Sequence, residues 1–364
     1  MLVYILSFAV TIFFTYCAEV SFKSRKKYIG IIVSIFAILV PSLVAGLRDY
    51  SIGTDVEVYV LRTFNLAANS STLSEFLSEY NVDIGYTVFN FIVSRFTENP
   101  QAILFMTQFV IASLVYICAY RERENVSMTM FMTIYLLTMF NQSLNIARQS
   151  IAIALTIFSY TYLRKNKLIK YILCIILATC FHSTAIFAVP IYFINKLVNS
   201  KAKRKYQIII ILAFVMSITF FEEILKFAIY DLHILSERYL YYLNDTTTTT
   251  ISLFQIIFRI VLIVIIVLNK KRIEIEKYNL MFTLLIINLL TYLFNAITMY
   301  AGRISYYYGQ IAMLIAISTI STKWKKRENR IAFNICIIIF FIISFIIQYV
   351  IGNSGETYPY KFLS

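Results

Sequence analysis

Long apolar runs recur along the 364 residues of the chain, and short segments rich in lysine and arginine separate them. Many runs reach the ~20 residues that an α-helix needs to cross the hydrocarbon core of a bilayer. Hydrophobic residues make up 60% of the chain and charged residues 14%, against roughly 45–50% and 25% in soluble domains. The sequence therefore predicts an all-α, polytopic integral membrane protein. It excludes a soluble enzyme, a disordered tail and a secreted disulfide scaffold.

Ten apolar runs predict one membrane crossing each, at 2–20, 28–47, 100–120, 126–143, 146–163, 206–222, 251–268, 278–299, 303–321 and 331–351. The segment 168–197 is too long for one crossing, and basic residues flank both of its ends. Because lysine and arginine favour the cytoplasmic side, we expect this segment to enter the membrane and return as two short limbs. Its tip lies near His182, and Pro190 interrupts the return limb. The prediction is a single transmembrane domain over 1–364 with about twelve crossings and both termini outside.

Six predicted cytoplasmic loops hold 24 of the 33 lysine and arginine residues. Of the other nine, on the outer side or within spans, seven are arginines and two are lysines: Arg48, Arg62, Arg95, Arg148, Arg238, Arg259, Arg303, Lys226 and Lys361. The planar guanidinium group binds phosphate and carboxylate oxygens in a bidentate way that lysine does not reproduce. This excess of arginine indicates an anionic ligand at the outer boundary. Ion pairing with aspartate, or contact with lipid headgroups, is the alternative for some of these arginines.

Two outer segments are predicted beside the spans. The outer loop 48–83 contains Thr72 and Glu75 in the spacing of a capping box before Phe76, which predicts a short surface helix. The outer segment 222–250 begins with an amphipathic pattern typical of a helix in the membrane interface.

The first polar cluster follows the second predicted span. Arg48, Asp49 and Asp55 interrupt a long uncharged run, and Gly53 permits a tight turn between them. Arg48 is placed to hold a phosphate, while Asp49 or Asp55 is placed to act as a general base or to orient the arginine. A solvated loop that begins with an interfacial arginine is the simpler alternative.

The second cluster joins two spans through Asn145, Arg148 and Gln149. Arg148 and Gln149 fall in the first turn of a predicted helix, where a positive side chain opposes the helix dipole unless an anion is bound. Backbone N–H groups, the dipole and the guanidinium together favour a phosphate site. An arginine that merely reaches to the interface is the alternative.

Two further clusters lie at the same predicted boundary. His182 is one of two histidines in the chain, and histidine at membrane depth can accept a proton near neutral pH. A hydrogen-bonded structural histidine is the alternative. Arg303 precedes a tyrosine cluster that includes Tyr307, which suits either sugar binding or an interfacial belt. Arginines from three hairpins would together suit a substrate with a diphosphate at the headgroup level and a lipid tail.

In this order, the same segments resemble the EpsG family of bacterial exopolysaccharide polymerases, which are related in role to Wzy-type polymerases. The resemblance rests on Leu47-Arg48 with Gly53-Thr54-Asp55 and Tyr59, Asp83-Ile84-Gly85-Tyr86, Asn145 to Ala152, Phe181-His182-Ser183, and Arg303 followed by Tyr307. It covers most of the chain and is less distinctive after about residue 205.

The resemblance implies a polymerase, similar to GT-C membrane glycosyltransferases, that joins polyprenyl-diphosphate-linked oligosaccharide repeats at the outer face of the bacterial cytoplasmic membrane. His182 is then the leading general base and Asp55 its rival. The implied diphosphate ligands are Arg48, Arg148, Arg303 and Gln149, and the implied sugar-binding residues are Asp49, Tyr59, Asn145 and Tyr307. No metal, cofactor or nucleic acid is expected, and a chain-length regulator is a candidate partner beside the lipid-linked substrate and membrane lipids.

Three alternatives remain open from sequence. A flippase for lipid-linked oligosaccharide would also need arginines near a diphosphate, but along a central cavity that reaches both sides. A membrane acyltransferase would use His182 as its base and leave the outer arginines without a purpose. A ligase that transfers glycan to another lipid acceptor performs nearly the same chemistry as a polymerase.

Overall fold

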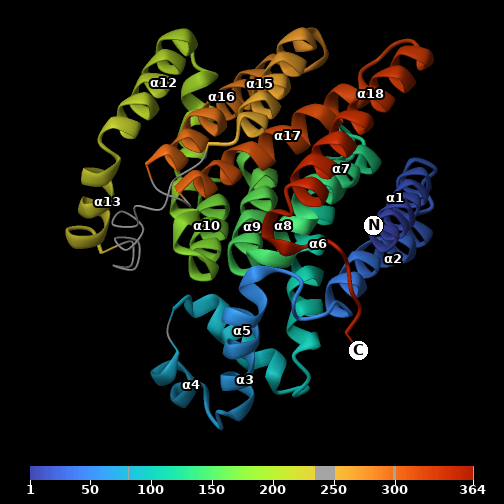
Figure 1. Ribbon diagram of the computed structural model, residues 1–364. Coiled ribbons are helices and arrows are strands. Elements are labelled where there is room, and N and C mark those ends of the chain that lie inside the picture. The colour runs from blue at the N-terminus through green and yellow to red at the C-terminus, as the bar shows by residue number, and fades with distance from the viewer. Residues whose placement is uncertain (81, 234–250, 298–300, 364) are drawn as a thin grey trace.

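The computed structural model describes residues 1–80, 82–233, 251–297 and 301–363. Within these ranges the chain is almost entirely helical (Figure 1). An antiparallel bridge between Arg48 and Phe362 brings the C-terminal tail beside the 48–83 loop. The predicted all-α class is confirmed for the described part of the chain.

Five described helical segments are long and apolar enough to cross a membrane, namely Leu2–Lys23, Lys27–Gly46, Gln101–Glu122, Ile275–Ala296 and Arg327–Ile351. There is a sixth candidate span if Lys203–Ser217 and Glu222–Tyr230 together form one span, although an 86° bend separates these two helices. Several other apolar helices are shorter, among them Leu168–Phe181, Ser183–Val198 and Leu253–Leu268. A multi-pass membrane protein follows, while twelve crossings and the sides of the termini stay predictions.

Helices α1 (Leu2–Lys23) and α2 (Lys27–Gly46) form an N-terminal hairpin that packs on α6 (Gln101–Glu122). The buried face of α2 carries small residues such as Gly30, Ser34 and Ala37, whereas large side chains such as Ile35 and Phe36 are exposed. Small residues let helices approach closely when lipid, not water, surrounds them. The α2 pattern is therefore that of a membrane helix, with its bulky apolar side outward.

Four short elements form a lobe at one end of the bundle (Figure 1). They are the π-helix η1 (Val56–Leu61), α3 (Arg62–Asn69), α4 (Leu73–Glu79) and α5 (Ile84–Ser94). The predicted capping box is present, because Thr72 accepts from Glu75 N and Glu75 accepts from Thr72 N. A short helix, α4, is therefore present where the sequence of the 48–83 loop predicted one.

The centre of the bundle consists of two nearly enclosed helices, α9 (Ala147–Leu163) and α17 (Ser305–Thr322). Around them pack α7 (Met128–Tyr135), the π-helix η2 (Leu136–Phe140), α8 (Asn141–Asn145), α10 (Leu168–Phe181), α16 (Ile275–Tyr292) and α18 (Arg327–Phe345). The remaining elements are η3 (Ser183–Ala188), α11 (Pro190–Val198), α12 (Lys203–Thr219), α13 (Phe221–Tyr230), α15 (Leu253–Leu268), η4 (Lys270–Arg272), η5 (Leu293–Ala296), η6 (Ala301–Ile304), η7 (Ile346–Ile351) and η8 (Ser354–Glu356). Of the predicted amphipathic segment 222–250, residues 234–250 lie outside the described residues, and the first part is α13.

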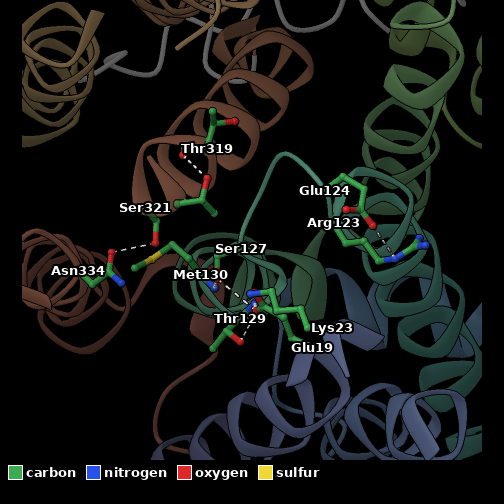
Figure 2. A network of polar contacts seen from close by, with 11 residues as sticks. Glu19, Lys23, Arg123, Glu124, Ser127, Thr129, Met130, Thr319, Ser321 and Asn334 are labelled. Atoms are coloured by element: carbon green, nitrogen blue, oxygen red, sulfur yellow. Dashed lines mark hydrogen bonds and ion pairs between the residues drawn. The ribbon is translucent and has the colours of Figure 1, made fainter. Parts of the chain in front are cut away.

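A buried carboxylate fixes the start of α7. Glu19 accepts hydrogen bonds from Thr129 N (2.9 Å) and Thr129 Oγ1 (2.7 Å), and Lys23 Nζ lies 2.7 Å from its other oxygen (Figure 2). The first N–H groups of a helix have no partner within that helix, and a negative charge there also complements the helix dipole. Ser127 N further donates to Ser318 O, so the same point connects α1, α7 and α17.

The basic loops and the lobe lie at opposite ends of the bundle. Figure 1 shows the α15–α16 and α17–α18 turns, which carry lysine and arginine, at the end far from α3, α4 and α5. The separation agrees with the charge pattern from which the orientation was predicted.

Candidate functional site

The loop after α2 is folded against the turn between α8 and α9. Gly53 has a φ of +95°, and a Cβ added there would lie 2.5 Å from Leu144 O. Only glycine adopts such a conformation at so close an approach without strain. Asn145 Oδ1 then accepts from both Thr54 Oγ1 and Asp55 N, each at 2.9 Å. Asn145 therefore positions Asp55 by holding its loop.

Asp55 stands half-buried at the start of η1. Burial raises the pKa of its carboxyl group above the usual 3.8, and the positive charges of Arg303 and Arg148 oppose this rise. Desolvation penalises the ionised form of an acid, while nearby cations favour it. Asp55 therefore lies within electrostatic range of two of the predicted arginines.

Arg148 lies in the first turn of α9, as the sequence predicted. Its Nη1 lies 2.6 Å from Asp83 Oδ2, and its guanidinium carbon lies 5.4 Å from the centroid of the Tyr59 ring. The side chain of Asp83 is 3% exposed and that of Arg148 is 18% exposed. Arg148 is thus oriented by a buried carboxylate while part of its side chain reaches the surface.

Asp83 comes to this position because α5 packs closely on the end of α10. A Cβ at Gly85 would lie 2.9 Å from the backbone of Cys180, and the rings of Phe89 and Phe181 are 6.2 Å apart. This contact places the start of α5 beside the His182 turn. The segment Asp83 to Tyr86 contributed to the family resemblance, yet Asp83 was not among the predicted site residues.

His182 occupies the predicted tip between α10 and η3, where the backbone is extended. Its Nδ1 lies 2.7 Å from Thr184 Oγ1, which in turn lies 3.0 Å from the hydroxyl of Tyr307. Tyr307 is fully buried. The hydroxyl of Thr184 connects it to His182. Thr184 is a further residue that the sequence did not single out.

Two side chains hold the backbone at Arg303 and at the preceding residue, Gly302. Gln149 Nε2 donates to Arg303 O at 3.4 Å, and Gly302 N donates to Asn295 Oδ1 at 2.8 Å. Gln149 is 2% exposed. Its hydrogen bond to Arg303 O holds the backbone of η6 beside α9. Gln149 thereby joins the arginine of α9 to the arginine of η6.

Arg48 has a different environment from Arg148 and Arg303. It is 2% exposed and donates to three backbone carbonyls, those of Ala45 (2.8 Å), Leu144 (3.0 Å) and Ile52 (3.3 Å). Burial lowers the pKa of its guanidinium to about 10. These bonds end α2 and connect the 48–55 loop to α8, so the observed contacts of Arg48 are structural.

Asp49 and the C-terminal tail complete the loop. Asp49 Oδ1 accepts from Ser51 N (3.0 Å) and Ser51 Oγ (2.6 Å), and these bonds lower the pKa of the Asp49 carboxyl. Asp49 N donates to Lys361 O, and Gly53 N donates to Glu356 O. The C-terminal tail thus supports the loop that carries Asp55. The sequence pattern did not indicate this contact between distant segments.

The candidate site is built from two carboxyl groups, two arginines and a histidine, which come from five separate segments. Asn145 holds the loop of Asp55, Asp83 pairs with Arg148, and Gln149 contacts the backbone of Arg303. The start of α5, which carries Asp83, packs on the end of α10 beside the His182 turn. Fixed cations beside a partly desolvated acid suit the binding of an anionic leaving group and the removal of a proton.

Comparison with known proteins identifies the family of the chain. No curated protein and no solved structure matches the chain. The profile of the EpsG family matches residues 31–362, which contain the whole candidate site. The chain is a member of the EpsG family.

Proposed function

We propose that this protein polymerises oligosaccharide repeat units linked to polyprenyl diphosphate, at the non-cytoplasmic face of the bacterial inner membrane. Membership of the EpsG family indicates a polymerase-like role in exopolysaccharide biosynthesis. The observation that supports the finer proposal is that Asn145 holds the loop of Asp55 beside α9, which carries Arg148, while Gln149 of the same helix contacts the backbone of Arg303.

In the proposed reaction, a hydroxyl group of one lipid-linked repeat attacks the anomeric carbon of the growing chain. The bond between that carbon and the diphosphate breaks, a glycosidic bond forms, and polyprenyl diphosphate leaves. Negative charge grows on the leaving group, and Arg148 and Arg303 stabilise it. Preorganised donors of this kind contribute ~2.7–4 kcal/mol each in enzymes where one has been removed.

The proton of the attacking hydroxyl passes to a general base. His182 is the proposed base, and its contact with Thr184 through Nδ1 orients the ring and directs Nε2 away from that hydroxyl. Asp55 is the rival, supported by its coupling to both arginines. Tyr59, which stacks on Arg148, is the proposed sugar contact with the largest exposed surface. Asp49, Asn145 and Tyr307 remain proposed sugar contacts, although their observed bonds hold the loop and the His182 turn.

The test is to reconstitute the purified protein in liposomes with a synthetic lipid-linked repeat and to look for a glycan ladder. The ladder should be strongly reduced with Asp55→Asn or His182→Ala and unchanged with Glu98→Gln, which changes an exposed acid between α5 and α6. No ladder, together with movement of the lipid-linked repeat across the bilayer, would establish a flippase instead. Transfer of a single glycan to another lipid would establish a ligase.

A further inference from the structure

The C-terminal tail, residues 353–363, lies along the loop that carries Asp55. It runs past α8 toward the end of α2 (Figure 1). Three backbone hydrogen bonds join the tail to this loop: Leu363 N donates to Leu47 O, Asp49 N donates to Lys361 O, and Gly53 N donates to Glu356 O. A change in the position of the tail would therefore be transmitted to the segment between α2 and η1.

Within the tail, Gly355 contacts the side chain that holds Asp55. The φ of Gly355 is +71°, and a Cβ added there would lie 2.8 Å from Asn145 Nδ2 and 3.1 Å from Asn145 Cβ. A larger residue would therefore need a left-handed backbone and would push against the amide. At the other end of this amide, Asn145 Oδ1 accepts from Thr54 Oγ1 and Asp55 N. The Asn145 amide thus lies between the tail and the Asp55 loop.

Thr357 anchors the tail two residues further on. It is fully buried, its Oγ1 accepts from Asn141 Nδ2 at 3.0 Å, and its backbone oxygen accepts from the hydroxyl of Tyr4. Asn141 begins α8, the short helix that ends at Asn145. Thr357 and Gly355 therefore contact the two ends of the same helix, which fixes the position of the tail along α8.

Asn145 connects two groups of the candidate site. It holds the backbone of Asp55 and lies three residues before Arg148, at the turn where α8 ends and α9 begins. Catalysis depends on fixed positions of the groups involved, and a displacement of ~1 Å caused by a remote change can lower a rate ~10²-fold. A contact that fixes Asn145 therefore acts on the position of the acid relative to the arginine.

We propose that Gly355 and Thr357 are positioning residues for the polymerisation reaction. Thr357 fixes the tail on α8, Gly355 holds the amide of Asn145 in place, and Asn145 places Asp55. The inference rests on the proposed function, in which Asp55 is one of two candidate bases. It assigns to the tail a role in the reaction in addition to its role in supporting the loop.

Gly355→Ala is the first test, with the exposed neighbour Ser354→Ala as its control. The added methyl group should displace the Asn145 amide and release the N–H of Asp55. Hydrogen–deuterium exchange of the segment 52–56, measured on the purified full chain in detergent without substrate, should then be about fivefold faster, as the loss of one hydrogen bond predicts. Exchange within α9 should stay unchanged.

The kinetic test separates positioning from substrate binding. In liposomes, Gly355→Ala should lower the maximal rate of ladder formation at least about tenfold, since the reacting groups are displaced. The KM for the lipid-linked repeat should stay within about twofold, because the arginines that bind the diphosphate are retained. Ser354→Ala should match the unmodified protein in both values.

A second pair of variants keeps the test valid if Gly355→Ala does not fold. Thr357→Val preserves the shape of the side chain but removes the acceptor of Asn141 Nδ2, whereas Thr357→Ser retains the hydroxyl group. Thr357→Val should therefore give the same faster exchange at 52–56 and the same lower maximal rate. Thr357→Ser should restore both values.

Unchanged exchange at 52–56 in Gly355→Ala and Thr357→Val would overturn the proposal. Faster exchange with an unchanged maximal rate would also overturn it, because the tail would then support the loop without affecting the reaction. A raised KM with a normal maximal rate would assign the tail to substrate binding instead. The absence of a ladder from the unmodified protein would count against the proposed function, while the exchange measurement, which needs no substrate, would still show whether the tail positions Asp55.

Discussion

Arg148 and Asp83 form an ion pair 2.6 Å long between residues that are 65 positions apart, with the carboxylate almost completely buried. The pair joins the first turn of α9 to the start of α5, and so joins the lobe to the centre of the bundle. A partly buried arginine that is held by one carboxylate keeps a fixed direction for its remaining N–H groups.

Asp83→Asn tests whether this pair orients Arg148. The amide retains the shape but removes the charge, so Arg148 loses its fixed direction and polymer formation should fall at least about tenfold, the effect of one charge-assisted bond. Breaking such a pair also lowers the free energy of unfolding, by up to ~3–5 kcal/mol where burial is complete. The ladder assay and thermal unfolding in detergent measure the two effects, with Glu98→Gln as the control. An unchanged ladder would show that the orientation of Arg148 is unimportant.

Arg148→Lys tests the planar geometry of the guanidinium. Lysine preserves the positive charge and can still contact Asp83, but it cannot also present a second parallel donor to a phosphate. We expect membrane insertion and folding to persist and polymer formation to be lost. Titration of the lipid-linked repeat in the reconstituted system gives the measurement. A variant that makes polymer of normal length would refute bidentate binding.

Glu19→Ala tests the contact at the start of α7, far from the candidate site. The change leaves Thr129 N without its partner and removes a buried charge-assisted network, which should lower the free energy of unfolding by ~1.5–3 kcal/mol. Glu124→Ala is the matched control, because its side chain is 82% exposed and it lies 3.6 Å from Arg123. Such surface pairs contribute little. Thermal unfolding should therefore shift for Glu19→Ala alone, and equal shifts would contradict the role given to Glu19.

The sequence predicted the helical class, the capping box at Thr72 and the His182 turn, because each depends on short-range pattern. Apolar length, cap spacing and flanking charge are local properties. The position of Arg148 in the first turn of α9 was predictable for the same reason. The tip at His182 followed from basic residues on both sides of one apolar segment.

The partners of the site residues could not be predicted in this way. Asp83 reaches Arg148 only because Gly85 allows α5 to approach α10, and Arg48 was expected at the ligand surface but donates to Leu144 O in the interior. These contacts join segments far apart in the chain, so no periodic pattern records them. The support of the Gly53 turn by Glu356 O is of the same kind.

The pH dependence of polymer formation separates the two candidate bases. Burial raises the pKa of Asp55 above 3.8, so the folded protein binds its proton more tightly than the unfolded chain does. The contribution of Asp55 to stability is therefore highest at low pH and declines as the pH rises from 3.8 through the raised pKa.

If Asp55 is the base, activity should rise with pH through that raised value, and Asp55→Asn should remove the rise. If His182 is the base, a rise with pH should persist at a lower rate in Asp55→Asn. His182→Gln should then remove it. Initial rates of ladder formation from pH 4 to pH 9 in ~0.5-unit steps resolve the two cases, because the rise with pH disappears only in the variant that lacks the base. A rise that survives both substitutions would exclude both residues as the base and leave the arginines as the catalytic groups.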